Sequence, residues 1–396
     1  MLSKFNVSQN WRNFFEESGL NNKSYKLFIE TAYGCHADCF GCPIPKESRA
    51  AKDPKWDLNK LEPILSNFGD NLLNWRKENN LPNIENLAIT VGPAENLIFS
   101  EEYLIKMANV SKGFAKKINT KEFHLSIATS GLFSVKKVEP KIKALKSILN
   151  NNELALAWVF NIRQFAKTPK HYYAFAEYIF ENIDLVELEI NLDNNIYLLN
   201  NDLLKEFGNF VSSFPFVQLD FAYAINDGNT TKTYLNNEEF IDFIEKTRNF
   251  SGSLFKKYFS QWDQNLFMFS EEDFVFDNEF NVLANNILNK SIRLNAMGEW
   301  HFAQNILGNF YYDENFEQVS LGDSNSNPYS EEAIEKFIKN YRKFLYKQLA
   351  THHICDQCKY KNICVSSGYI NYVKYSDKNE KYCTNPGFTV FNRNKS

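Results

Sequence analysis

The chain contains 396 residues with a formal net charge of −4, and 44% of the residues are hydrophobic and 23% are charged. These proportions are ordinary for a folded globular protein and exclude an intrinsically disordered chain. The acidic balance argues against a nucleic-acid-binding protein, which normally presents a basic face. A chain of this length can bury a large core, either as two domains or as one barrel with an appendage.

Neither a membrane span nor a signal peptide is predicted. No uninterrupted apolar run reaches the roughly 18 residues that a membrane-spanning helix needs. Residues 1–22 are polar with scattered aromatic side chains, and they lack the apolar segment of a signal peptide. We therefore expect a cytoplasmic protein whose partners include neither membranes nor nucleic acids.

Strand and helix patterns alternate along the chain up to about residue 250. Strands are predicted from continuous or alternating apolar runs, and helices from apolar residues at helical spacing. The predicted strands are residues 25–33, 85–91, 123–129, 154–160, 185–192 and 217–224, and the helices that follow them are residues 54–79, 101–118, 135–149, 170–182, 202–214 and 237–250.

This alternation indicates a parallel sheet with right-handed crossover connections. The run at residues 154–160 is apolar almost throughout, as expected for a strand that is covered on both faces. Six strand–helix units are too few to close an eight-stranded barrel. The predicted fold class is therefore α/β, a partial (β/α)6 TIM barrel with its functional residues at the C-terminal ends of the strands.

The pattern changes after residue 250. Residues 251–290 show no clear periodicity and are interpreted as a linker. A hairpin is predicted over residues 291–303, followed by a short strand at 318–321 and a helix that Ser330 caps. The predicted regions are an N-terminal lead-in (1–24), the partial barrel (25–250), the linker (251–290) and a smaller C-terminal α+β domain (291–396).

Three cysteines lie close together after the first predicted strand, at Cys35, Cys39 and Cys42. Their Cys-x3-Cys-x2-Cys spacing supplies three thiolates for a single inorganic centre. A structural zinc site needs four ligands, whereas a 4Fe–4S cluster held by three cysteines keeps one iron open to another ligand. The spacing favours the cluster, and a partial zinc knuckle or three unrelated buried cysteines are the alternatives.

The other four cysteines form a second set near the C-terminus, at Cys355, Cys358, Cys364 and Cys383. Seven cysteines divided in this way make a poor disulfide framework and a good metal-ligand pattern in a reducing compartment. Four thiolates can close a zinc site or fully ligate an iron–sulfur cluster, and the spacing does not choose between them.

The first cysteine set resembles the signature of the radical S-adenosylmethionine (SAM) superfamily, which follows the first strand of a partial barrel. The resemblance implies that Cys35, Cys39 and Cys42 hold a 4Fe–4S cluster whose open iron is chelated by SAM. An electron from a donor such as flavodoxin or ferredoxin then cleaves SAM to a 5′-deoxyadenosyl radical, which abstracts hydrogen from the substrate. Iron and SAM supply this chemistry, and the protein positions them.

The second cysteine set resembles the C-terminal SPASM domain of many peptide-modifying radical SAM enzymes. Gly368 stands where that domain has a further cysteine, and the predicted hairpin at 291–303 has no cysteine either. The resemblance therefore implies one auxiliary 4Fe–4S cluster, fully ligated by the four C-terminal cysteines, for electron relay or domain rigidity. A structural zinc ribbon is the alternative.

Radical SAM enzymes also carry a Gly-Gly-Glu-Pro-like turn after the second strand, which meets the amino group of SAM. Here Gly92-Pro93-Ala94-Glu95 resembles that turn, with the acid one position later. A solvated loop glutamate and ordinary capping asparagines are the alternatives. No catalytic side chain is assigned. The residues suggested for SAM contacts are Phe40, Gly92, Glu95, Ser130, Asn161 and Asn191.

The predicted function is a radical SAM enzyme that cross-links, epimerises or oxidises a ribosomally made peptide, because SPASM-like appendages resemble those of such enzymes. The 24 residues before the first strand are too few for a leader-peptide-binding domain. A precursor would then dock on the C-terminal region or through a partner. The alternatives are a radical SAM enzyme for a small metabolite and a non-catalytic zinc-binding protein.

Overall fold

The structure is a computed structural model that describes residues 23–35, 49–50, 56–192, 201–211, 213–214, 216–221, 288–302 and 319–351. Within these ranges Cys35 is the one cysteine. Phe40 and the other six cysteines lie outside the described residues. The predicted helix at 237–250 and nearly all of the predicted linker also lie outside them.

One nine-stranded sheet forms the centre of the described structure, in the order β6-β5-β4-β3-β2-β1-β7-β8-β9. Neighbouring strands from β6 to β7 are parallel, and β8 pairs antiparallel with both β7 and β9. The predicted parallel sheet is confirmed. The strands are β1 (Ser24–Ala32), β2 (Asn86–Pro93), β3 (Glu122–Thr129), β4 (Leu154–Phe160), β5 (Leu185–Leu192), β6 (Phe216–Phe221), β7 (Ser291–Leu294), β8 (Glu299–Phe302) and β9 (Ser320–Asp323).

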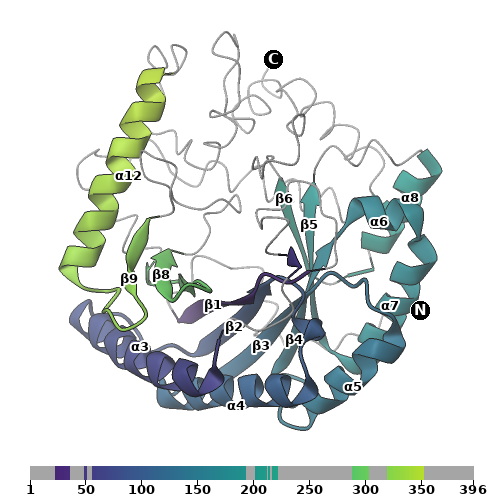
Figure 1. The fold of residues 1–396 in the computed structure, drawn as a ribbon, viewed down its shortest axis with the longest axis horizontal. Helices are drawn as coiled ribbons and strands as arrows, with labels where there is room; N and C mark the ends of the chain where they lie inside the picture. Colours follow the sequence, from purple (N-terminus) through teal and green to yellow (C-terminus); the bar gives the residue numbers. More distant parts are fainter. Residues whose placement is uncertain are drawn as a thin grey trace.

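Helices cover one side of this sheet, and Figure 1 shows them as a curved row outside it. The sheet curves along this row of helices like part of a barrel wall. α12 (Glu331–Thr351) lies beside β9, the edge strand opposite β6 (Figure 1). The predicted partial barrel is thereby confirmed. The other helices are α3 (Leu58–Glu78), η1 (Asn96–Ile98, a 3-10 helix), α4 (Glu101–Lys117), α5 (Val135–Lys146), α6 (Ile162–Lys167), α7 (Pro169–Asn182) and α8 (Asn201–Val211).

Side-chain caps determine where several helices begin. Asp57 accepts a hydrogen bond from the backbone N–H of Asn59 at the start of α3, at 3.0 Å. Ser330 accepts one from the N–H of Ala333 at the start of α12, at 3.2 Å, as predicted. The short helix α6, which Asn161 caps, was not among the predicted elements, because six residues carry too little periodicity to indicate a helix.

The two faces of the parallel strands carry different side chains. Leu87, Ile89 and Val91 of β2 belong to the apolar core beneath the helices. Successive side chains of a strand point to opposite faces, so the residues between these three lie on the concave face of the sheet. The fold is therefore stabilised mainly from the helix side. The concave-face residues of the central strands are small: Ala88, Thr90 and Gly92 on β2, Ser126 and Ala128 on β3, and Ala155 and Ala157 on β4.

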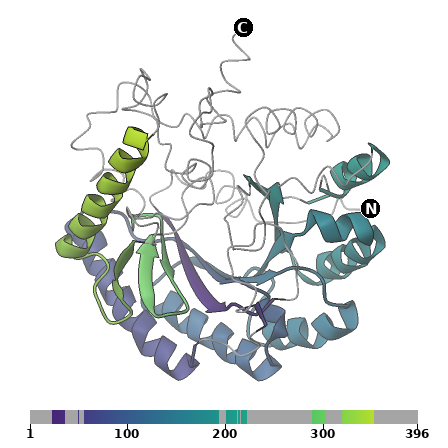
Figure 2. The same ribbon diagram turned by 45° about the horizontal axis from the view of Figure 1, so that its top comes forward.

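The predicted hairpin extends the barrel sheet. β7 pairs in parallel with β1, with Phe28 opposite Arg293 and Ile29 opposite Leu294. Figure 2 shows the green β7–β8 hairpin beside the purple β1. β7 thus gives β1 a hydrogen-bonded neighbour on its second edge, which removes an exposed edge strand. The division into a barrel and a C-terminal domain at residue 291 stays a prediction.

Arg76 of α3 holds the segment that leads into β7. Its Nη1 donates to the carbonyl oxygen of Asn289 at 3.1 Å, and its Nη2 donates to that of Pro82 at 2.6 Å. The hydroxyl groups of Tyr25 and Tyr329 share a buried hydrogen bond of 2.5 Å. The Arg76 contacts tie α3 to the segment before β7, and the tyrosine pair ties β1 to the loop before α12. The hairpin is therefore anchored at its base as well as along β1.

Trp158 of β4 lies at the centre of an aromatic cluster beneath α7. Its ring stacks on Tyr172 at a centroid distance of 5.7 Å and meets Phe175 edge to face at 4.7 Å. Gly131, which follows β3, has a φ of +69° and lies against the indole. A Cβ added to Gly131 would lie 2.3 Å from the indole nitrogen, so this position requires glycine for two independent reasons.

We expect Gly131→Ala to lower the free energy of unfolding by about 2 kcal/mol or more, because it adds backbone strain to a steric clash with a buried ring. Gly113→Ala is the matched control. Gly113 lies in α4 with nothing within 4 Å of the added Cβ, so alanine should raise stability by about 0.5–1 kcal/mol. Urea unfolding midpoints of the three proteins measure both effects, and equal midpoints for the two variants would contradict the packing described here.

Candidate functional site

Cys35 lies just beyond the C-terminal end of β1, where partial barrels place their chemistry. Its backbone N–H donates to the carbonyl oxygen of Arg49 at 3.0 Å. The carbonyl oxygen of the preceding Gly34 accepts a hydrogen bond from the N–H of Glu95 at 3.2 Å. Two neighbouring segments therefore fix the backbone that leads into the cysteine loop.

The donor chemistry at this position suits an iron–sulfur cluster. Cys35 is partly exposed at the end of a rigid strand, and Cys39 and Cys42 follow within seven residues of sequence. Three thiolates at this spacing are the ligands that a 4Fe–4S cluster with one open iron requires. Within the described part of the chain, no group of three or more His, Cys, Asp or Glu side chains is gathered for a metal ion.

Glu95 is buried at the end of β2, with 1% of its surface exposed. Its Oε2 accepts hydrogen bonds from Thr129 Oγ1 at 3.0 Å and from both the backbone N–H and the Oγ of Ser130, at 2.8 and 2.6 Å. Its Oε1 accepts one from the N–H of Leu97 at 3.2 Å. Burial raises the pKa of Glu95, and these four hydrogen bonds oppose the rise. Glu95 thus joins the ends of β2 and β3.

The burial of Glu95 excludes the alternative of a solvated loop glutamate. Its contact with the amino group of SAM stays a prediction. Ser130, which is also predicted to contact SAM, binds Glu95 and is 5% exposed. The carbonyl oxygen of Ser130 accepts from Trp158 Nε1 at 3.2 Å, and that of Gly131 accepts from His171 Nε2 at 2.9 Å. Hydrogen bonds with Glu95, Trp158 and His171 therefore fix Ser130 and Gly131, the two residues after β3.

Gly92 lies in the same row of the sheet as Glu30, its partner on β1. A Cβ added to Gly92 would approach the Cβ of Ala128 on β3 to 3.2 Å, which is closer than most side chains tolerate. The peptide bond between Gly92 and Pro93 is cis. Glycine thus fits the close approach of β2 to β3 at this position, and its contact with SAM stays a prediction.

The two predicted asparagines lie on neighbouring strands. Asn161, directly after β4, is 4% exposed and accepts a hydrogen bond from the N–H of Gln164 at 3.1 Å, so it caps α6. The capping alternative therefore applies to Asn161. Asn191 lies near the end of β5, opposite Asp220 of β6. SAM contacts from either asparagine stay predictions.

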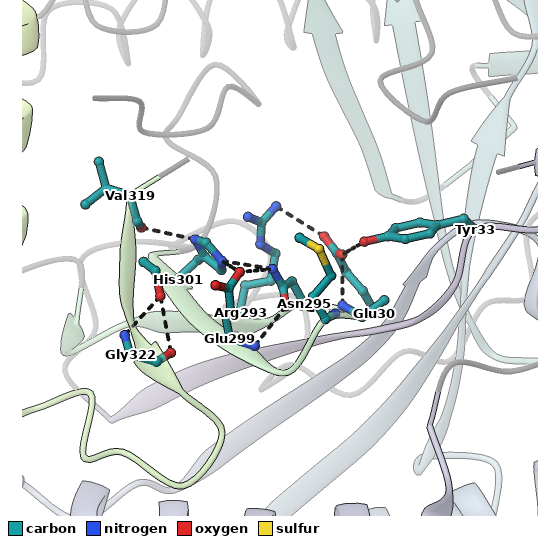
Figure 3. A network of polar contacts seen from close by, with 11 residues as sticks. Glu30, Tyr33, Arg293, Asn295, Glu299, His301, Val319 and Gly322 are labelled. Atoms are coloured by element: carbon teal, nitrogen blue, oxygen red, sulfur yellow. Dashed lines mark hydrogen bonds and ion pairs between the residues drawn. The ribbon is translucent and has the colours of Figure 1, made fainter. Parts of the chain in front are cut away.

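A network of polar side chains that was not predicted from the sequence joins β1 to the hairpin (Figure 3). Glu30 forms a buried ion pair with Arg293 of β7, with 3.2 Å between Oε1 and Nη1. Its Oε2 accepts from the hydroxyl group of Tyr33 at 3.2 Å and from the N–H of Ala296 at 3.3 Å. Burial and the nearby Glu30 carboxylate raise the pKa of Tyr33 to about 12, so Tyr33 is a neutral donor.

His301 lies farther along the same network and is neutral. Its Nδ1 donates to the carbonyl oxygen of Val319 at 3.1 Å, and its Nε2 accepts from Asn295 Nδ2 at 3.0 Å (Figure 3). Asn295 Oδ1 in turn accepts from the N–H groups of Met297 and Glu299, at 3.0 and 2.8 Å. Burial and the nearby Arg293 lower the pKa of His301 to about 4. His301 thus holds the hairpin turn against β9 and is not exposed as a ligand.

Only part of this network could have been predicted from local sequence patterns. Strand alternation could have placed Glu30 on the concave face, because Tyr25, Leu27 and Ile29 form the buried face of β1. Its partner Arg293 lies 263 residues later in the chain, and no local pattern indicates that β7 pairs with β1.

Solved structures of known proteins show the same fold. A structure described as native anSMEcpe with bound AdoMet and Kp18Cys peptide is similar over 93% of this chain and 95% of that chain, with 15% sequence identity and a TM-score of 0.51. Native anSMEcpe with bound AdoMet is similar with the same coverage, identity and TM-score. These are structures of an anaerobic sulfatase-maturating radical SAM enzyme. The chain therefore has the partial-barrel fold of these structures.

No family model matches the chain, and no curated protein sequence matches it. Among the described helices, none is both long and apolar enough to span a membrane.

We expect Glu95→Ala to lower the free energy of unfolding by about 3 kcal/mol, because it leaves the buried donors of Thr129, Ser130 and Leu97 without their acceptor. Glu85→Ala is the matched control. Glu85 precedes the same strand and pairs on the surface with Lys23 and Lys121, so its loss should change stability little. Chemical unfolding followed by circular dichroism measures both, and a similar loss in the two variants would contradict the bridging role of Glu95.

Acid should destabilise the hairpin through His301. The folded chain keeps this imidazole neutral down to about pH 4, whereas the unfolded chain takes up a proton below about 6.5, so stability falls as the pH falls between these values. The loss between pH 7 and pH 4.5 should be about 2 kcal/mol larger in the wild type than in His301→Gln. Unfolding free energies of both proteins across this pH range measure the difference, and parallel curves would show that His301 is not buried in its neutral form.

Proposed function

We propose that the chain is a radical SAM enzyme that acts on a peptide. The observation that carries the proposal is the position of Cys35 at the C-terminal end of the first barrel strand, with Cys39 and Cys42 at the spacing that holds a three-cysteine cluster. The likeness in fold to a protein solved with AdoMet and a peptide supports it. The likeness also favours a peptide over a small metabolite as the substrate.

In this proposal Cys35, Cys39 and Cys42 hold a 4Fe–4S cluster to which SAM binds. When bound, the cluster and SAM supply the reductive cleavage that forms a 5′-deoxyadenosyl radical, with the electron coming from a donor such as flavodoxin or ferredoxin. The protein's own part is to position the cluster ligands. Backbone hydrogen bonds of Gly34 and Cys35 to two other segments hold the start of the cysteine loop, and the strand ends beside it are joined through Glu95.

The SAM contacts follow from the same arrangement. Glu95 Oε1 accepts one hydrogen bond and keeps a lone pair that could accept from an ammonium group. Ser130 and Gly92 lie on the adjoining strand ends. We assign Phe40, Asn161 and Asn191 to the remaining SAM contacts. Asn161 Oδ1 also caps α6.

We further propose that Cys355, Cys358, Cys364 and Cys383 hold one auxiliary 4Fe–4S cluster in a C-terminal domain over residues 291–396. A fully ligated cluster has no open iron, so electron relay or local stabilisation is its function rather than substrate binding. The reaction is cross-linking, epimerisation or oxidation of the peptide, in the cytoplasm. All three reactions begin with the same hydrogen abstraction.

Anaerobically purified protein should contain about eight irons per chain, four for each cluster. The triple variant Cys35→Ala, Cys39→Ala, Cys42→Ala should lose reductive SAM cleavage, because only this site leaves an iron open for SAM. The matched control, Cys358→Ala with Cys364→Ala, should lose about half the iron and still form 5′-deoxyadenosine. Iron analysis and chromatography of the dithionite reaction measure these outcomes.

Two results would contradict the proposal. Zinc at one or two equivalents with little iron would indicate the non-catalytic zinc-binding protein. Undiminished 5′-deoxyadenosine from the triple variant would place the SAM site elsewhere in the chain.

A further inference from the structure

The ion pair between Glu30 and Arg293 is buried in the protein. The side chains of Glu30 and Arg293 are 11% and 6% exposed, and their charged atoms are 3.2 Å apart. By contrast, the ion pairs of Glu85 with Lys23 and Lys121, just before β2, lie on the surface, where such pairs contribute little. A buried pair loses its hydration, and an apolar pair of similar volume would often stabilise a fold as well or better.

Glu30 also gathers contacts from three separate segments. Its carboxylate binds Arg293 of β7 and the N–H of Ala296 in the hairpin turn, so it holds the hairpin at two points. Its backbone carbonyl oxygen accepts from Trp56 Nε1 at 2.9 Å, just before α3. Tyr33, two residues before Cys35, donates to the same carboxylate. The hairpin and the start of the cysteine loop are therefore joined through one residue.

This ion pair lies close enough to Cys35 for its charges to affect the reduction potential of a cluster bound there. Glu30 precedes Cys35 by five residues on the same extended segment, so their Cα atoms are at most about 17 Å apart. The nearby His301 is neutral above its lowered pKa, and Glu299 at the hairpin edge is more exposed. Charges within such a distance and out of bulk water shift the reduction potential of an iron–sulfur cluster.

We infer that Glu30 and Arg293 are positioning residues that dock the β7–β8 hairpin on the cysteine-bearing end of β1 and keep the charge beside the cluster balanced. This inference rests on the proposed function. It explains why a buried ion pair stands where an apolar contact could dock the hairpin: either charge alone would change the potential at which the cluster accepts its electron.

The test uses Glu30→Gln and Arg293→Met in the full chain. Glu30→Gln removes one negative charge and should raise the midpoint potential of the SAM-binding cluster. Arg293→Met removes one positive charge and should lower this potential. An EPR-monitored redox titration measures the potential, and the response of the signal to added SAM identifies the cluster. Glu85→Gln, which removes a charge near the opposite end of β1, should leave the potential unchanged.

The double variant Glu30→Gln with Arg293→Met separates charge from packing. It removes both charges while keeping similar volume, so its potential should return to that of the wild type. Its thermal midpoint, measured on iron-free protein, should be higher than the sum of the two single effects predicts, because the second change removes the buried charge that the first leaves behind.

Each outcome decides the inference. Shifts of opposite sign in the single variants support it when the double variant has the wild-type potential and a thermal midpoint above the sum of the single effects. Shifts of the same sign, or no shifts, with normal iron content overturn it. If the single variants do not fold, a folded double variant with the wild-type potential supports it, and a potential unlike the wild type overturns it. A double variant that does not fold overturns it. A wild type without iron would instead refute the proposed function, and the inference with it.

Discussion

The pairing of β1 on both edges is the constraint on which the rest of the structure depends. β2 binds one edge and β7 the other, both in parallel, so the strand that leads into Cys35 lies inside the sheet rather than at its border. A strand held on both sides has little freedom to shift its register, because a slip of one residue would move every side chain to the opposite face. Tyr25, Leu27 and Ile29 are held in the helix-side core in this way, and Glu30 is directed to the concave face.

Much of the barrel could be predicted from the sequence, because its signals are local. The bounds predicted for the strands at residues 154–160 and 185–192 agree with β4, a continuous apolar run, and with β5, an alternating one. The start of α12 was predicted because a serine cap with two glutamates in the first turn is a local pattern. What such signals omit is pairing between distant segments. The hairpin at residues 291–303 was predicted as a hairpin, yet its place beside β1 depends on contacts with residues near the start of the chain.

In the candidate site too, local features could be predicted from the sequence, whereas contacts between separate segments could not. The cysteine spacing and the strand-end positions of Gly92, Glu95 and Ser130 are readable from the sequence. The hydrogen bonds of Glu95 are not, because they depend on how closely the end of β2 approaches the end of β3. Asn161 illustrates the reverse: a polar residue directly after a strand can either cap the next helix or face a ligand, and the sequence leaves both possible.

The polar groups at the strand ends are already bound to one another, and this has a consequence for the chemistry. Glu95 and Ser130 bind each other, and Glu30 binds Arg293, so these groups do not have to be reorganised when a cofactor arrives. Preorganised polar groups in a site shielded from water orient a bound molecule without an entropic cost at the moment of reaction. A reactive radical needs such a site, because any group free to move toward it becomes a competing hydrogen donor. The hydrogen bonds between the strand ends therefore serve the proposed chemistry by holding these polar groups in place before a cofactor binds.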